Sequence, residues 1–110
     1  MFHMLTCFDL NQKQSLEEFQ RSLIDYTTHM HELDLVESNS PVGVRQTSTI
    51  LDTDDDRNQN CFVLMHFRDK AQSDDAVTYI ESRKEPIWSI QTKLYSQREN
   101  YIFTCWQNVE

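Results

Sequence analysis

The sequence predicts an α+β fold in which two β-α-β units share one four-stranded antiparallel sheet. Three observations lead to this prediction: a strand-like segment at residues 61–68 that is apolar on both faces, a long amphipathic helix before it, and a capped helix directly after it. The 110 residues, 38% hydrophobic and 25% charged, have the size and composition of one globular domain, residues 1–110.

The first half of the chain is expected to form a strand and a helix. Residues 2–10 alternate between two faces and are rich in strand-forming side chains. Ser15 and Glu18 form a capping box, in which each satisfies a backbone donor at a helix start. The apolar stripe of this helix is Leu16, Phe19, Leu23, Tyr26, Met30 and Leu33.

An edge strand and a turn are expected to follow. Residues 35–41 are interpreted as a connection because they contain Asn39 and Pro41. Residues 42–51 are rich in β-branched side chains but only half apolar, which is typical of an edge strand with one wet face. The acidic segment 52–60 then joins this strand to the next as a hairpin.

The central strand and the second half complete the sheet. One face of the central strand is Cys61, Val63, Met65 and Phe67, and the other is Phe62, Leu64, His66 and Arg68. Asp69 and Gln72 form a second capping box before a helix at 71–83, in which Ala76, Val77 and Ile80 are expected to point inward. Pro86 opens a short helix at 87–95, and residues 101–106 form the closing strand.

The order β-α-β-β-α-α-β is that of a ferredoxin-like βαββαβ sandwich with an extra short helix before the last strand. Two right-handed crossovers around a central hairpin give the strand order 4-1-3-2, with the helices on one face. The other face would carry Leu5, Cys7, Phe62 and Leu64. Because burying a Phe or Leu side chain contributes about 1.5–3 kcal/mol, we expect this face to be covered.

The simplest cover is a second copy of the chain, packed sheet to sheet as a homodimer. The alternative is a monomer whose C-terminal residues, 106–110, fold back over the sheet. Five residues are few for that purpose, so the sequence favours the dimer.

Charge and composition exclude several classes of function. The net charge of −8 would repel phosphate backbones, so nucleic-acid binding is not expected. No apolar run approaches the roughly 18 residues of a membrane span, and the N-terminus has no signal-peptide pattern, which favours a cytoplasmic protein. Cys7, Cys61 and Cys105 are expected to be buried reduced thiols, without a disulfide or metal framework.

Two histidines are the candidate catalytic residues. His3 and His66 belong to the same predicted face of neighbouring strands, where an imidazole could act as a general acid or base. Together with Asp9, they could line a cavity at the centre of a dimer. The full set of expected ligand-binding residues is Leu5, Leu64, His66, Arg68, Trp88 and Trp106. The competing interpretation is that these are core and interface residues, with the histidines satisfied by hydrogen bonds or solvent.

Other motifs are not expected to form sites. His29 and His31 point about 200° apart on a helix and cannot chelate one metal ion. The Asp52-x-Asp54-x-Asp56 pattern imitates a calcium loop, but Arg57 and Val63 stand where that loop needs Gly and Glu. The chain has one glycine and no Gly-rich phosphate loop, nucleophile elbow or zinc spacing, so no metal or cofactor is expected.

The segment Phe62-Val-Leu-Met-His-Phe-Arg-Asp69, continued by Ala71-Gln72 and by Glu81-Ser-Arg83, resembles a known family. The opening Met1-Phe-His-Met and the closing Ile102-Phe-Thr-Cys-Trp are similar to it as well. The family is that of short uncharacterised bacterial proteins within the dimeric α+β barrel proteins, alongside stress-responsive A/B barrel domains and small cofactor-free monooxygenases. The resemblance implies a dimer with ligand-sized cavities near the sheet, but no particular reaction.

Three functional hypotheses follow. The first is a homodimer that binds a small apolar or aromatic molecule in a cavity beside the sheet. The alternative is a cofactor-independent enzyme, monooxygenase-like or isomerase-like, that uses His3 or His66 as its acid or base. A regulatory module that responds to amino acids is a third possibility, although no effector domain is fused to it.

Overall fold

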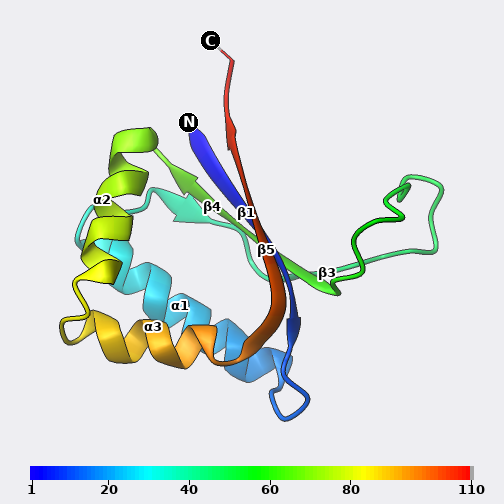
Figure 1. Cartoon of the computed structure of the whole chain (residues 1–110), viewed down its shortest axis with the longest axis horizontal. Coiled ribbons are helices and arrows are strands. Elements are labelled where there is room, and N and C mark those ends of the chain that lie inside the picture. The colour runs from blue at the N-terminus through cyan, green and yellow to red at the C-terminus, as the bar shows by residue number, and fades with distance from the viewer. Residues whose placement is uncertain (110) are drawn as a thin grey trace.

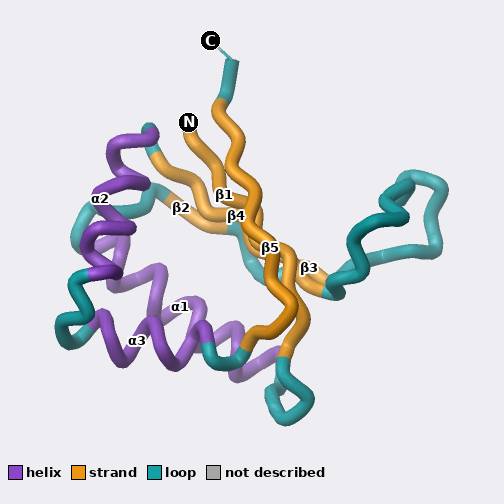
Figure 2. The backbone as a smooth tube through the Cα atoms, in the orientation of Figure 1, coloured by secondary structure: helices purple, strands orange, loops and turns teal. Residues whose placement is uncertain are grey.

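The computed structural model describes residues 1–109. In chain order, the elements are β1 (Phe2–Leu10), α1 (Leu16–Glu32), β2 (Ser38–Asn39), β3 (Gly43–Val44), β4 (Cys61–Phe67), α2 (Lys70–Glu81), α3 (Ile87–Tyr95) and β5 (Arg98–Gln107). The strands form one antiparallel sheet in the order β2-β4-β1-β5, with β3 also paired to β4. The three helices lie on one side of this sheet (Figure 1, Figure 2). The predicted strand order and helix layer are confirmed.

The first helix forms where its cap and its apolar stripe predict it. The Ser15 hydroxyl accepts a hydrogen bond from the Glu18 backbone N–H at 3.1 Å. Four stripe residues are buried against the sheet, namely Phe19, Leu23, Tyr26 and Met30. Leu16 and Leu33, at the two ends of the stripe, are exposed.

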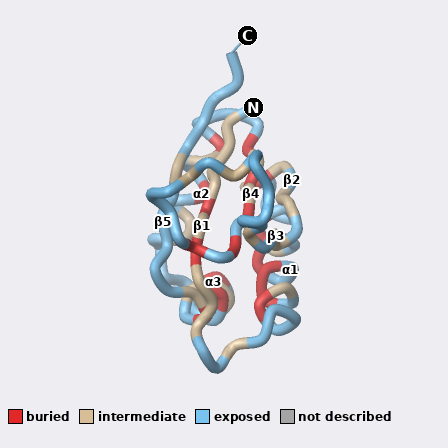
Figure 3. Tube along the Cα trace, turned by 90° about the vertical axis from the view of Figure 1, so that its right-hand side faces the viewer, coloured by how far each residue is buried: buried red, intermediate tan, exposed pale blue. Residues whose placement is uncertain are grey.

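The register between β1 and β4 decides which side chains reach the core. Seven consecutive pairs run from Phe2 opposite Phe67 to Phe8 opposite Cys61. The buried residues of these two strands are Thr6, Phe8, Cys61, Val63, Met65 and Phe67. Successive side chains of a strand point to opposite faces, so these residues share the face toward the helices, as the alternation predicts. Figure 3 shows the buried positions along β1 and β4 beside an exposed β5.

The predicted edge strand at 42–51 is wrong over most of its length. Only Gly43–Val44 is a strand, and β2 lies within the segment interpreted as a connection. The chain then leaves the sheet as a long loop, residues 46–59, which we call the arm, and which projects away from the helices (Figure 1).

Hydrogen bonds from Arg45 to the arm explain why the chain does not continue the strand. The Arg45 guanidinium donates to both carboxylate oxygens of Asp52, at 2.8 and 2.9 Å, and to the Asp54 carbonyl at 2.7 Å. It also donates to the Arg57 carbonyl. These local bonds replace the ladder that a longer edge strand would form, and only half of the segment is apolar.

Smaller differences concern the second half of the chain. Val77 is 48% exposed although we expected it inside. The buried neighbour of Ala76 on α2 is instead Gln72, whose amide donates to the Asp34 carbonyl at 3.0 Å. Cys105 is exposed because it lies on the edge strand β5. The sequence had predicted a buried thiol at this position.

Within residues 1–109, none of the helices has both the length and the apolarity that crossing a lipid bilayer requires.

Replacing Gly43 by Ala is expected to destabilise the protein. A Cβ atom at this position would lie 2.0 Å from Cε1 of Phe62, so the aromatic ring must move. Overpacking of this kind typically costs about 1–3 kcal/mol. Urea unfolding at one fixed protein concentration measures the loss.

The control is Val44→Ala, which changes an exposed side chain on the same strand and should have little effect. Combining Gly43→Ala with Phe62→Ala removes the clash, so the glycine substitution should then cost much less. An equal cost of Gly43→Ala in both backgrounds would contradict this explanation.

Candidate functional site

The sheet face away from the helices, which we call the outer face, gathers most of the residues singled out in the sequence. Three neighbouring strands contribute to it: His3, Leu5 and Cys7 from β1; Phe62, Leu64 and His66 from β4; and Ile102, Thr104 and Trp106 from β5. Cross-strand pairing places His3 opposite both His66 and Trp106, and Leu5 opposite both Leu64 and Thr104. The structure therefore brings Leu5, Leu64, His66 and Trp106 together.

The two candidate histidines form a hydrogen-bonded pair. Nδ1 of His3 lies 2.7 Å from Nδ1 of His66, and the rings meet edge to face. Nε2 of His3 lies 2.7 Å from Oδ1 of Asn108. The amide oxygen can only accept, so His3 donates from Nε2; the neutral form of His3 then accepts at Nδ1, where His66 donates. Partial burial, followed by repulsion from His3, lowers the pKa of His66.

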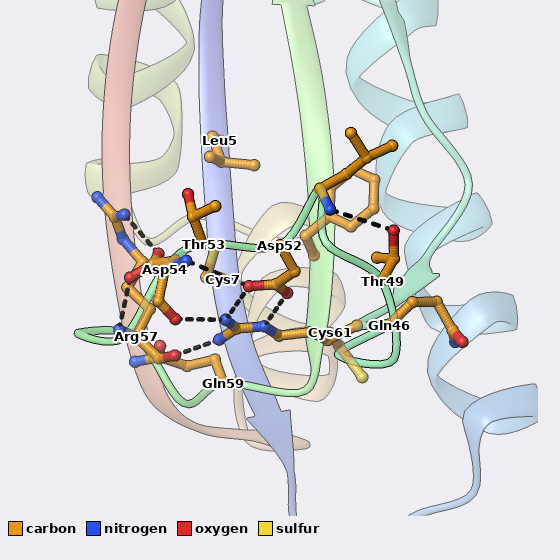
Figure 4. Close-up of a pocket in the computed structure, with 13 residues that line it drawn as sticks. Leu5, Cys7, Gln46, Thr49, Asp52, Thr53, Asp54, Arg57, Gln59 and Cys61 are labelled. Atoms are coloured by element: carbon orange, nitrogen blue, oxygen red, sulfur yellow. Dashed lines mark hydrogen bonds and ion pairs between the residues drawn. The ribbon is translucent and has the colours of Figure 1, made fainter.

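The arm and the outer face line an open pocket of about 500 Å³. The sheet side of this pocket is formed by Leu5, Cys7, Cys61 and Phe62, and the arm supplies Asp52 and Asp54 on the other side (Figure 4).

The carboxylates of this pocket already have partners. Asp52 is paired with Arg45, and hydrogen bonds from the Arg57 backbone and side chain lower the pKa of Asp54 to about 2. The two carboxylates therefore stabilise the arm and are not free to bind a ligand in the pocket. The pattern that resembles a calcium loop serves here to bind Arg45 and Arg57. Within residues 1–109, no cluster of three or more His, Cys, Asp or Glu side chains is suited to a metal ion.

Three expected members of the site lie elsewhere. Arg68 pairs with Glu37 at 2.9 Å and with Asp34 at 3.4 Å, next to the end of α1. Trp88 is on α3, in the helix layer, where the Arg83 guanidinium stacks 5.6 Å from the centre of its ring. Asp9 accepts from the Asn60 backbone N–H and from the Asn100 amide at the far end of β1.

A second hollow lies on the opposite side of the sheet, between it and the helices. This helix-side cavity has a volume of about 420 Å³. Its apolar walls are Met4, Met30, Val36, Met65, Phe67, Ala76, Val77, Ile80 and Phe103, and its polar groups come from Tyr26, Ser73, Glu81, Gln91 and Tyr95.

Two polar features distinguish the helix-side cavity from ordinary core. The Tyr26 and Tyr95 hydroxyls lie 3.4 Å apart, and Oε1 of Gln91 is buried without a hydrogen-bond partner. Burial raises the pKa of Tyr26 well above its usual range, so its hydroxyl stays protonated. The sequence placed Tyr26 in the apolar stripe of the first helix and gave no signal for Gln91, since a cavity between packed layers has no sequence pattern.

Comparisons with known proteins identify the architecture. No protein-family model matches the chain, and no curated protein matches it significantly. Among solved structures, the Arabidopsis thaliana protein At3g17210 has a TM-score of 0.74 at 7% identity, with coverage of 100% of this chain and 97% of that one. A dimeric ferredoxin-like protein of unknown function from Jannaschia sp. has a TM-score of 0.65 at 11% identity, covering 97% and 98%.

A dabb family protein from Mesorhizobium loti, also described as ferredoxin-like, has a TM-score of 0.57 at 18% identity, covering 99% and 97%. The chain has a ferredoxin-like fold. The fold that its resemblance to dimeric α+β barrel proteins implied is therefore confirmed, while identities this low leave the function to the site itself.

Within this ferredoxin-like sheet, the histidine pair should make stability depend on pH. Because the pKa of His66 is lowered on folding, the unfolded chain binds more protons between the folded value and about 6.5. The contribution of His66 is therefore complete above pH 6.5, and it is lost as the pH falls through the folded pKa. We expect His66→Gln to flatten the decline of the unfolding free energy between pH 7 and pH 5.

Urea titrations at several pH values test this expectation. His31→Gln is the matched control, because His31 is exposed on α1. If His31→Gln and His66→Gln change the pH profile equally, the decline does not come from the pair.

Proposed function

We propose that this protein is a homodimer that binds a small apolar or aromatic molecule in the helix-side cavity of each protomer. The observation that carries the proposal is the lining of this cavity, which is mostly apolar with a few polar groups. Its volume of about 420 Å³ lies in the range of small-molecule sites, which is roughly 300–1,000 Å³.

The polar groups suggest how such a molecule would be oriented. The Tyr26 and Tyr95 hydroxyls can donate hydrogen bonds to an oxygen of the ligand. The hydrogen bond between them is long, at 3.4 Å, and therefore weak enough for a ligand to replace. The unpaired oxygen of Gln91 would gain a partner from a hydroxyl or N–H of the ligand after a small side-chain rotation.

The homodimer rests on the outer face. Phe62, Ile102 and Trp106 are exposed there next to Leu5 and Leu64, and Trp106 leaves 60% of its surface uncovered. An apolar patch of this kind favours a partner surface. The Jannaschia neighbour is itself described as dimeric, which supports the same arrangement for this chain.

The arm adds a second reason to expect a partner on this side. Ile50 and Leu51 of the arm are 93% and 88% exposed, and the arm projects away from the helices (Figure 1), so a second copy on the outer face could cover these side chains. In this proposal Leu5, Leu64, His66 and Trp106 belong to the dimer face. The three free cysteines favour a reducing compartment such as the cytoplasm.

The alternative function is a cofactor-independent enzyme, and the hydrogen-bonded His3–His66 pair is the observation that favours it. A neutral imidazole at the dimer face could take a proton from a quinol-like substrate. Under this alternative, His3→Ala and His66→Ala would each abolish catalysed oxygen uptake with 1,4-naphthohydroquinone while the far-UV circular dichroism stays unchanged. Uptake no faster than the protein-free oxidation would exclude this reaction.

Filling the helix-side cavity should weaken ligand binding. Ala76 is buried and lines the cavity from α2, so Ala76→Leu would occupy part of the space that a ligand needs. We expect the affinity for the neutral probe 2-naphthylmethanol, measured by isothermal titration calorimetry, to fall at least tenfold. Ala71→Leu, at an exposed position of the same helix, is the control and should bind as the parent does. Equal affinities of the two variants would argue against this cavity as the site.

A charge on the outer face should separate the protomers. Trp106→Asp would place a carboxylate in the apolar contact, and we expect the dimer dissociation constant to rise by roughly two orders of magnitude, as for an interface anchor. Analytical ultracentrifugation measures the change. The control is Ile24→Asp, an exposed apolar position on α1 in the helix layer. A wild-type chain that is monomeric at micromolar concentration would contradict the homodimer itself.

A further inference from the structure

The positively charged side chain of Arg98 lies among aromatic rings at the start of β5. The Arg98 side chain is half-buried, and its guanidinium carbon lies 4.2 Å from the ring centre of Tyr95 and 5.0 Å from that of Tyr101. Phe103 and Phe8 complete the surroundings at 5.5 and 5.9 Å. Arginine stacks favourably on aromatic faces, so the four rings hold this guanidinium in a fixed place.

This half-buried guanidinium forms no ion pair within residues 1–109. The chain carries eighteen acidic residues against ten Lys and Arg. Within residues 1–109, however, the ion pairs are formed by Arg45, Arg57, Arg68 and Lys70, and none involves Arg98. Its Nε is buried without a hydrogen-bond acceptor. Burial lowers the pKa of Arg98, which reflects the cost of removing the cation from water.

The unpaired cation lies next to the helix-side cavity. Arg98 lines a void of about 10 Å³, roughly the space of one water molecule. Four residues line both this void and the helix-side cavity, namely Met4, Met65, Tyr95 and Phe103. One layer of side chains thus separates the guanidinium from the ligand space. Phe103 in that layer is 45% exposed, so its ring can turn without disturbing a closely packed core.

We propose that the ligand of the helix-side cavity is an apolar carboxylate, whose hydrocarbon or aromatic part fills the cavity and whose anionic group pairs with Arg98 once the Phe103 ring has turned aside. The inference rests on the proposed function. The planar guanidinium fork matches the two oxygens of a carboxylate, and the Tyr95 hydroxyl supplies a further donor nearby. The aromatic surroundings reduce the contact of the guanidinium with water, which strengthens the ion pair relative to one at a fully exposed position.

Other ligand charges fit less well. A neutral ligand would leave the Arg98 guanidinium without an anionic partner, and a cationic ligand would be repelled by it. Glu81 is the one carboxylate that lines the cavity within residues 1–109, and it is exposed at the cavity margin, where water screens it. An anionic group on the ligand would give Arg98 the ion-pair partner that it lacks.

Three probes that share the naphthalene ring test the inference on the wild-type full-length protein. We expect 2-naphthoate to bind at least tenfold more tightly than 2-naphthylmethanol, and 2-naphthylmethylammonium to bind most weakly, by isothermal titration calorimetry at pH 7.5. A hydrogen bond to a charged group commonly contributes a factor of this size. Equal affinities for the acid and the alcohol, or a preference for the amine, would overturn the inference.

Substitutions locate the effect. Arg98→Met should abolish the preference for 2-naphthoate and change binding of 2-naphthylmethanol by no more than about threefold, while Arg98→Lys should retain part of the preference. Arg83→Met, at an exposed arginine stacked on Trp88, is the matched control. A preference that survives in Arg98→Met overturns the inference.

The probe comparison on the wild-type protein does not depend on whether these variants fold. If the wild-type protein binds 2-naphthylmethanol but shows no preference for the acid, only the carboxylate inference fails. If it binds none of the three probes, the proposed function fails with it.

Discussion

The pairing of β1 with β4 is the constraint on which the rest of this structure depends. Both strands are apolar on both faces, so hydrophobicity alone would tolerate either orientation. The register from Phe2–Phe67 to Phe8–Cys61 sends Val63 and Met65 to the helices and His66 to the opposite side. A slip of one residue would exchange the two faces, turning Val63 and Met65 outward and placing the histidines against the helices.

Because of this register, the two faces of the sheet have different roles. The helix face holds the packed core and a cavity with few polar groups, whereas the outer face carries an apolar patch with a histidine pair at one end. The proposed ligand and the proposed partner copy therefore never compete for the same side chains. Residues of β5 take part in both, because Phe103 faces the cavity and Trp106 faces outward.

Much of the fold, and part of the site, could be predicted from the sequence. Period-two alternation places His3 and His66 on one face, and the structure then joins them at 2.7 Å. The arm could not be predicted, since the bonds from Arg45 to Asp52 and to two carbonyls lie outside any periodic pattern. Arg98 was missed for a similar reason: it precedes the predicted strand, and its aromatic neighbours come from three separate elements.

The net charge of −8 by itself opposes an anionic ligand. However, the effect of each charge on the ligand depends on its distance from the ligand and on its burial. Surface carboxylates farther than about 10 Å from the ligand are screened at 0.1 M ionic strength, whereas a charge held among aromatic rings is screened far less. At the Tyr95 end of the cavity, the local field is therefore set by Arg98 rather than by the sum over the surface. The acidic surface would repel polyanions in general, whereas the half-buried guanidinium of Arg98 could pair with one small apolar anion.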